Sequence, residues 1–403
     1  MDTGDTAWVL ASSALVLLMI VPGLALFYGG LVRSKNVLAT IAQSFVILCM
    51  ISLLWVVVGY SLAFGPDKWG ITGGLEWVGL KGVTMDPHPT YGPTIPHQAF
   101  MVFQLMFAAI TPALITGAFA ERMKFSALLL FAVFWSVLVY GPLAHWLWGG
   151  GWLAKMGALD FAGGAVVHIS SGTAALVCAL VLGKRQGYGT DYMAPHNLPL
   201  TLLGTGLLWF GWFGFNAGSA LGANGTAVGA FIATHTAAAA AALTWMLVEW
   251  FHRGSPTVLG IASGAVAGLA TVTPGAGYVG PFSALLIGLA AGGVCYVAVV
   301  RWKGKLGYDD SLDVVGIHGV GGVMGILATG LLASKAVNPA GADGLFFGHP
   351  AFFGVQALTV VATVLYSSIA TYVILKLVDR MVGLRVSAAE EAMGLDLSQH
   401  DER

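Results

Sequence analysis

The sequence predicts an all-α integral membrane protein with eleven transmembrane helices, and three observations support this fold class. Hydrophobic residues make up 57% of the 403 residues, and charged residues only 9%. The chain contains eleven apolar runs of roughly 20 residues, the length that crosses a hydrocarbon layer about 30 Å thick. Lysine and arginine gather at alternate ends of these runs. A soluble protein that hides its apolar residues in one core is therefore excluded.

The expected spans follow one another in chain order, mostly with short connections. They cover about 8–31, 37–64, 99–120, 126–148, 162–183, 199–217, 227–251, 257–273, 281–300, 314–333 and 350–378. No basic leader precedes the first run, so we interpret it as helix 1 and not as a cleaved signal. The long connection 65–98 holds five prolines and is expected to be a structured external loop. Glycine-rich runs such as 288–293 and 319–325 predict closely packed helices.

The distribution of cations predicts the orientation in the membrane. Fourteen of the 18 lysines and arginines fall on one side, namely Arg33, Lys35, Arg122, Lys124, Lys184, Arg185, Arg253, Arg301, Lys303, Lys305, Lys376, Arg380, Arg385 and Arg403. Because positively charged short loops stay in the cytoplasm, the N-terminus is expected outside and the C-terminus inside a cell membrane. Residues 1–378 would form the transmembrane domain and 379–403 a cytoplasmic tail.

Two aspartate and histidine pairs suggest an internal repeat. Asp160 and His168 are eight residues apart, and Asp310 and His318 repeat that spacing. An odd number of helices per repeat inverts the second copy, so helices 1–5 and 6–10 are expected to form an inverted 5+5 repeat, followed by a long final helix. Eight residues of helix measure about 12 Å. Starting from opposite faces of the membrane, the two imidazoles should meet near its midplane.

Histidines inside a membrane point to function, because an ionisable group there is costly and tends to line a route for ions or protons. His168 and His318 in contact can share one proton, which suits them to bind a small polar guest or to relay a proton. His145, His235 and His252 lack such a partner and are interpreted as structural.

The two aspartates allow more than one role. Asp160 is expected to cap the following helix, to attract a cation, or both. Asp310 is expected to be a cytoplasmic cap or an ion-pair partner, although Asp309 and Asp313 are also possible helix starts.

Aromatic residues gather at the expected outer ends of helices 4 and 6. They lie in the segments 146–151 and 207–220, the second of which also carries Asn216 and Ser219. An aromatic belt at the membrane interface is one reading. Because aromatic faces attract cations, a cation-binding cage is the other.

Enzyme, metal and nucleic-acid readings find no support in the sequence. It holds no GxSxG, GxxxxGK[ST] or HExxH motif. Asp309 and Asp310 stand in a charged loop, which disfavours intramembrane hydrolysis. With a net charge of −1 and charges spread over short connections, no nucleic-acid partner is expected. Cys49, Cys178 and Cys295 lie in separate apolar segments and suggest packing. No metal or cofactor is expected.

Three segments, DFAGGAVVH at 160–168, GWFGFNAGS at 211–219 and DSLDVVGIHGVGG at 310–322, resemble the ammonium transporters of the Amt/Mep/Rh family. The resemblance implies a homotrimer with one pore per subunit. It also implies a set of site residues: Phe107, Trp148 and Ser219 with Asp160 at an outer ammonium site, Phe107 and Phe215 as a gate, and His168, His318, Trp212, Phe103 and Tyr140 along the pore. Trp148 and Ser219 indicate the Amt branch.

The resulting hypothesis is selective ammonium uptake, in which ammonium loses its proton at the outer site and ammonia passes the histidines. An ammonium sensor that signals through its tail is the alternative, and a channel for neutral solutes is a third reading. The tail from Gly383 resembles the family's regulatory C-terminus, implying a possible PII-type signalling partner. Its end, 400–403, departs from the family's usual His-Gly-Glu continuation.

Overall fold

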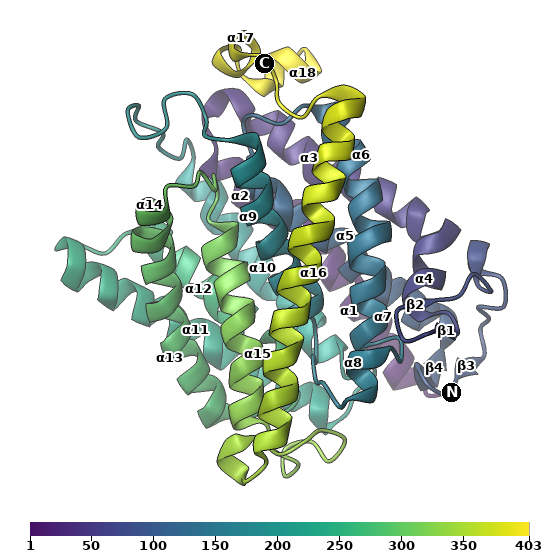
Figure 1. Ribbon diagram of the computed structural model, residues 1–403. Coiled ribbons are helices and arrows are strands. Elements are labelled where there is room, and N and C mark those ends of the chain that lie inside the picture. Colours follow the sequence, from purple (N-terminus) through teal and green to yellow (C-terminus); the bar gives the residue numbers. More distant parts are fainter. Residues whose placement is uncertain (403) are drawn as a thin grey trace.

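The computed structural model describes residues 1–402, and Arg403, one of the cations counted above, lies outside this part. Long helices run side by side through one bundle, with the N-terminus at one end and two short helices near the C-terminus at the other (Figure 1). We call these ends the N-terminal face and the C-terminal face. α17 (Ala388–Met393) and α18 (Leu395–His400) mark the C-terminal face.

The eleven spans expected from hydropathy are confirmed as eleven helices long and apolar enough to cross a membrane. Spans 1 to 5 consist of α1 (Thr3–Leu18), η1 (Met19–Leu24) and α2 (Ala25–Leu31); η2 (Ser34–Asn36), α3 (Val37–Leu54), η3 (Trp55–Gly59) and α4 (Tyr60–Phe64); α5 (His97–Phe119); α6 (Phe125–Trp135), η5 (Ser136–Tyr140), α7 (Gly141–Leu147) and α8 (Trp152–Lys155); and η6 (Gly164–Ile169) with α9 (Ser170–Leu182).

Spans 6 to 11 follow, with the longest connections at 183–197 and 333–349. They consist of α10 (Leu198–Gly218); α11 (Gly225–Arg253); α12 (Val258–Val272) with η7 (Thr273–Gly275); α13 (Pro281–Val297), η8 (Ala298–Trp302) and α14 (Lys303–Leu306); η9 (Val315–Gly319) with α15 (Val320–Leu332); and α16 (Pro350–Val382), which η10 (Leu345–Phe347) precedes. The last helix runs four residues beyond the expected end at 378.

The connection 65–98 is structured, as its prolines predicted. β1 (Asp67–Lys68) pairs antiparallel with β2 (Thr72–Gly73), and β3 (Pro87–His88) pairs antiparallel with β4 (Gly92–Pro96). Between the hairpins lies the short η4 (Val78–Leu80). The loop therefore forms two hairpins that pack against α4 and α7 through β2 and against α1 and α5 through β4, at the N-terminal face.

Glycine allows the close helix packing that the sequence predicted. A Cβ atom on Gly288 or on Gly268 would lie 2.4 Å from the Ala237 carbonyl oxygen, and one on Gly292 would lie 2.4 Å from the Ala241 carbonyl oxygen. Any side chain there would push α11, α12 and α13 apart. Small residues thus set how closely these helices approach in lipid.

Buried charges join distant connections at the C-terminal face. The Glu121 carboxylate pairs with Arg33 at 2.7 Å and with Arg185 at 3.3 Å, and Arg185 also pairs with Asp309 at 2.9 Å. Arg122 is fully buried and donates to the carbonyl oxygens of 118, 120 and 309. Since removing one partner leaves an uncompensated charge, this network fixes the ends of spans 1, 3 and 5 against the connection before span 10.

The tail folds back against loops of its own chain. The Asp396 carboxylate accepts a hydrogen bond from the Ala39 amide at 2.8 Å, and the Leu395 amide donates to Asn36 Oδ1 at 2.8 Å. Lys35 Nζ donates to the Glu391 carbonyl at 3.2 Å. The tail is therefore tied directly to the first residues of span 2.

Candidate functional site

The two repeated histidines meet in the middle of the bundle. His168 Nδ1 and His318 Nδ1 lie 3.2 Å apart, and the ring planes are inclined by 21°. Both side chains are buried, and each sits on a π-helical turn, η6 or η9. Such turns often occur at functional sites, because the wider turn redirects one side chain. One Nδ1 must donate and the other must accept, so the pair shares one proton at this contact.

Asp160 is a helix cap whose whole carboxylate is occupied by the backbone. Oδ1 accepts from the amides of Gly163 and Gly164 at 2.9 and 2.5 Å, and Oδ2 accepts from those of Ala165 and Val166 at 2.8 and 3.1 Å. Gly163 makes this turn with a φ of 115°, a left-handed value that glycine adopts without strain. Burial raises the pKa of the Asp160 carboxyl, while the four amides act to lower it.

Asp310 caps the equivalent turn in the second half of the chain. Its Oδ2 accepts from the Val315 amide at 2.7 Å. Burial is the main cause that raises the pKa of this carboxyl, to about 6. Lys303, which pairs with Asp313, opposes the increase. Of the two roles expected for Asp310, the structure shows the cap.

Aromatic rings separate the histidines from the N-terminal face. Phe107 of α5 stacks on Phe215 of α10 with centroids 4.2 Å apart. Trp212 stacks on His168 at 5.5 Å, and its indole Nε1 donates to Thr273 Oγ1 at 2.9 Å. From the N-terminal face inward the order is therefore the phenylalanine stack, then Trp212 with His168, then His318.

A hollow of about 250 Å³ lies on the far side of the phenylalanine stack from the histidines. It is lined by Thr90, Tyr91, Phe100, Gln104, Phe107, Leu147, Trp148, Phe161, Ser219 and Leu221. The Trp148 indole Nε1 donates to the Asp160 carbonyl oxygen at 2.7 Å, which fixes the ring at the wall. The Ser219 hydroxyl donates to the Phe215 carbonyl at 2.8 Å, leaving its oxygen lone pairs as acceptors.

The structure gathers most of the implied site residues but not all of them. Phe107, Trp148 and Ser219 line the hollow, whereas Asp160 lies behind its wall and acts through the backbone turn. Phe103 packs edge-on against Phe107 at 5.0 Å without lining the hollow. The Tyr140 ring lies against Trp55 at 6.1 Å, also away from the hollow.

Several lining residues were not anticipated from the sequence. Gln104 is a polar residue inside an apolar span, three positions before Phe107, and that position is the signal that could have identified it. Tyr91 and Phe161 come from connections, and no local pattern in the sequence places them at this wall.

A second hollow, of about 130 Å³, lies toward the C-terminal face. Its lining includes Ile317, next to His318, together with Phe27, Ser263, Asp313 and the Glu121 and Arg185 ion pair. The histidine pair therefore stands between two hollows that open toward opposite faces of the bundle.

The other histidines have structural contacts. His145 is fully buried and bonds to the Ala63 carbonyl at 3.0 Å and to the Asp67 carboxylate at 2.9 Å. His252 Nδ1 lies 2.7 Å from the Tyr296 hydroxyl, and His235 packs on the Trp209 ring at 5.4 Å.

Lowering the pH should loosen the first hairpin of the connection 65–98. Hydrogen bonds from Lys155 and then His145 lower the pKa of Asp67 to about 2, against an ordinary value of 3.8. Because the pKa is lower in the fold, its stabilisation is present above 3.8 and is lost as the pH falls toward 2. Amide hydrogen exchange at 67–73 should therefore accelerate, relative to the tail, when the pH is lowered through this window. Asp67→Asn should exchange faster already at neutral pH, and identical behaviour of both proteins would contradict the assignment.

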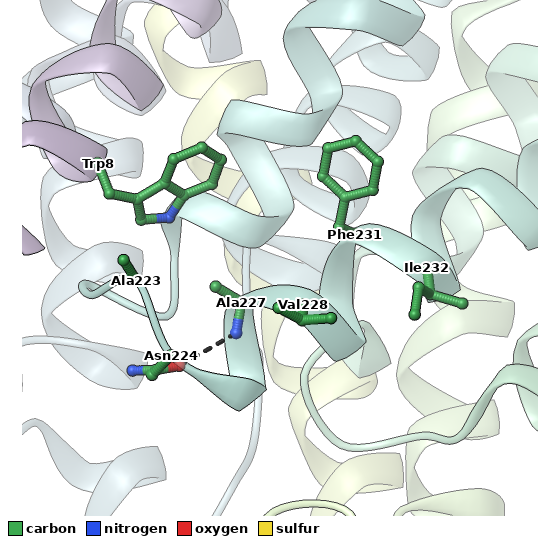
Figure 2. Close-up of a pocket in the computed structure, with 7 residues that line it drawn as sticks. All are labelled: Trp8, Ala223, Asn224, Ala227, Val228, Phe231 and Ile232. Carbon is green, nitrogen blue, oxygen red and sulfur yellow. Dashed lines mark hydrogen bonds between the residues drawn. The ribbon is translucent and has the colours of Figure 1, made fainter. Parts of the chain in front are cut away.

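Figure 2 shows a separate apolar hollow on the outside of the bundle. Its volume is about 300 Å³, and it is lined by Trp8, Ala223, Asn224, Ala227, Val228, Phe231 and Ile232. Asn224 Oδ1 caps α11 by accepting from the Ala227 amide at 3.1 Å. None of these residues belongs to the histidine site.

Comparison with known proteins gives one consistent result. A model of the Ammonium Transporter Family matches residues 7–403. An ammonium transporter of Bacillus subtilis is 55% identical over all of this chain and 98% of the relative, and ammonium transporter Amt1 of Archaeoglobus fulgidus is 52% identical over all of this chain and 99% of the relative.

Solved structures agree with this result. The crystal structure of Candida albicans Mep2 superposes with a TM-score of 0.91 at 38% identity, covering 97% of this chain and 88% of that one. A structure described as a sensor Amt protein superposes with a TM-score of 0.91 at 29% identity and covers 98% of both chains. The family consists of transporters, which confirms the interpretation that this is no enzyme. This multi-pass membrane protein therefore belongs to the ammonium transporter family.

Proposed function

We propose that this protein conducts ammonium selectively by binding the ion in the hollow lined by Phe107, Trp148 and Ser219, removing its proton, and passing ammonia along the histidine pair. The observation that carries the proposal is the order of layers: a hollow with aromatic faces and a hydroxyl acceptor, a closed phenylalanine stack, and the buried imidazole pair.

Each layer supplies one step. Aromatic faces attract a cation by about 0.5–2 kcal/mol, depending on its desolvation. Ser219 adds a hydroxyl oxygen that accepts from ammonium N–H. The stack of Phe107 on Phe215 offers a bare ion nothing to replace its water, so the ion has to lose a proton before it passes. Potassium has no proton to lose and is rejected.

The shared proton makes the histidine pair asymmetric. The imidazole that donates through Nδ1 has an unprotonated Nε2, and the one that accepts through Nδ1 carries its proton on Nε2. Ammonia, which both donates and accepts hydrogen bonds, is complementary to such a pair. We propose that the proton crosses by a route separate from the ammonia.

The transport proposal predicts a current that is selective for ammonium over potassium. Purified protein in a planar bilayer or on a supported membrane should give currents that rise with ammonium and not with potassium. Phe107→Ala and Phe215→Ala should raise potassium current relative to ammonium, because the closed stack is removed. Phe119→Ala, a buried phenylalanine of the same span outside the site, is the control. Equal potassium and ammonium currents in the unaltered protein would refute the proposal.

A sensor is the alternative function, and the similarity to a sensor Amt structure is the observation that favours it. A sensor would bind ammonium without significant flux and would signal through its tail. Proteoliposome uptake distinguishes the two directly, since binding without accumulation of ammonium would identify a sensor.

We also propose the orientation with the N-terminal face outside and an inverted repeat of spans 1–5 and 6–10. The distribution of lysine and arginine supports this orientation. The two capped π-helical turns that carry His168 and His318 support the inverted repeat. A cysteine placed at Lys81 should react with an impermeant maleimide added outside cells. Labelling of a cysteine at Lys305 instead would reverse the orientation.

A homotrimer is proposed as the assembly, with the apolar hollow of Figure 2 as part of its contact surface. Light scattering of the purified protein should give three times the 41.8 kDa chain mass. Ile232→Asn, in this hollow, should shift the mass toward one chain. Ile369→Asn, an exposed isoleucine on α16, should leave it unchanged.

For a PII-type signalling protein we propose the C-terminal face, where the tail contacts the loops, as the docking side.

A further inference from the structure

A third hollow opens on the outside of the bundle between α9, α13 and α15. It has a volume of about 390 Å³, and its lining is apolar apart from one threonine: Gly172, Thr173, Leu176, Val294, Trp302, Val315, Gly319, Val320, Val323, Met324 and Leu327. We call it the α9/α15 groove. The functional site described above uses none of these side chains.

Two glycines create the depth of this groove. A Cβ atom on Gly172 would lie 2.2 Å from Gly319 Cα, so α9 and η9 cross in contact at this point. Because neither glycine has a side chain, the backbone at this crossing forms the floor of the groove, and the neighbouring side chains form its walls. This floor lies directly beside His318, one residue away in the chain.

The end of the groove nearest the C-terminal face carries positive charge. Trp302 lines the groove and is 45% exposed. Lys305 lies one turn further along, on the same side of the helix, because residues three apart share a face. The Lys184 ammonium, from the end of α9, lies 4.0 Å from where a Cβ on Gly307 would be. Both walls of the groove therefore end in a lysine.

These lysines are available to an anion from the membrane. Both are exposed, and within residues 1–402 neither forms an ion pair with a carboxylate. Trp302 provides the amphipathic ring that favours the level of lipid headgroups. Basic pockets between transmembrane helices bind anionic headgroups.

We propose that the α9/α15 groove binds one anionic phospholipid, with an acyl chain over the Gly172 and Gly319 floor and the phosphate between Lys184 and Lys305. The apolar lining and the two ammonium groups, which have no carboxylate partner within residues 1–402, match the two parts of such a lipid; Lys184 lies over the Tyr188 ring at 5.4 Å. The site is independent of the proposed transport, so ammonium flux measured on the same vesicles separates failure of one proposal from failure of the other.

Quenching of Trp302 by brominated lipid tests the site. The protein is reconstituted in phosphatidylcholine doped with brominated phosphatidylglycerol or with brominated phosphatidylcholine, and the emission of Trp302→Phe is subtracted to isolate Trp302. Brominated phosphatidylglycerol should quench at about a tenfold lower mole fraction. Equal quenching by both lipids would overturn the proposal.

Two variants distinguish headgroup from chain binding. Lys184→Gln/Lys305→Gln should remove the preference for phosphatidylglycerol, whereas Lys376→Gln/Arg380→Gln, which removes two exposed cations near the same face from α16, should keep it. Val320→Phe fills the groove and should reduce quenching while the lysines remain. An unchanged preference in both the lysine and the Val320 variants would overturn the site. A disulfide between two copies of Val320→Cys would show that protein covers the groove, which would also overturn it.

Discussion

Replacing His168 and His318 together by alanine is expected to abolish the ammonium-selective current. The pair supplies the polar contacts and the shared proton of an otherwise apolar path, since the two Nδ1 atoms lie 3.2 Å apart and Trp212 stacks on the first ring. Losing both hydrogen-bond partners of ammonia should lower the current about a hundredfold, since each bond contributes up to about 1.5 kcal/mol. Currents on reconstituted protein, recorded separately in ammonium and in potassium, provide the measurement.

The control must remove a histidine that lies outside the proposed route of ammonia. His252 bonds to the Tyr296 hydroxyl at the far end of α11, so His252→Ala should leave the selectivity intact. If the double variant retained the ammonium current and its preference over potassium, the histidine pair would have no part in conduction.

The second large effect is expected from Asp160→Ala, which leaves four backbone amides at the start of η6 without an acceptor. Hydrogen bonds to a charged group contribute about 1.5–3 kcal/mol each. The effects of the four bonds are not additive, and we expect the free energy of unfolding to fall by about 3 kcal/mol or more. Ammonium flux should fall as well, because the loosened turn leads directly to His168.

Unfolding in detergent, followed by the denaturation midpoint, measures this loss. Asp160→Asn should lie between the two proteins, since its one amide oxygen can still accept from Gly163 and Gly164. Ser387→Ala removes an exposed cap from α17 and should cost only about 1 kcal/mol. A loss at Asp160→Ala as small as the Ser387 loss would show that the carboxylate does not hold the turn.

Hydropathy and charge in the sequence predicted much of the transmembrane architecture. Eleven apolar runs became eleven spans, because crossing a hydrocarbon layer imposes a length and a polarity that each segment must meet by itself. The equal spacing of Asp160 to His168 and of Asp310 to His318 predicted the meeting of the imidazoles, because a helix converts residue number into distance.

The roles of single side chains followed less well from the sequence. Both a cap and a cation ligand were consistent with Asp160, and only the path of 160–166 shows four amides converging on its carboxylate. The resemblance implies Tyr140 as a pore residue, and the structure shows its ring against Trp55, a contact between spans 2 and 4 that the sequence of neither span indicates. Phe161, from the connection before η6, reaches the hollow by tertiary packing alone, whereas Gln104 could have been identified as a polar residue inside an apolar span.

The sequence by itself thus determined the membrane fold, the number of spans and the histidine pair, all of which depend on local composition and on spacing within one helix. Only the tertiary structure decided that backbone amides occupy both carboxylate oxygens of Asp160, which rings line the hollow, and that Gly172 meets Gly319 to leave the α9/α15 groove. These features arise where helices distant in the sequence cross, and the crossing angles and rotations come from the packing of the whole bundle.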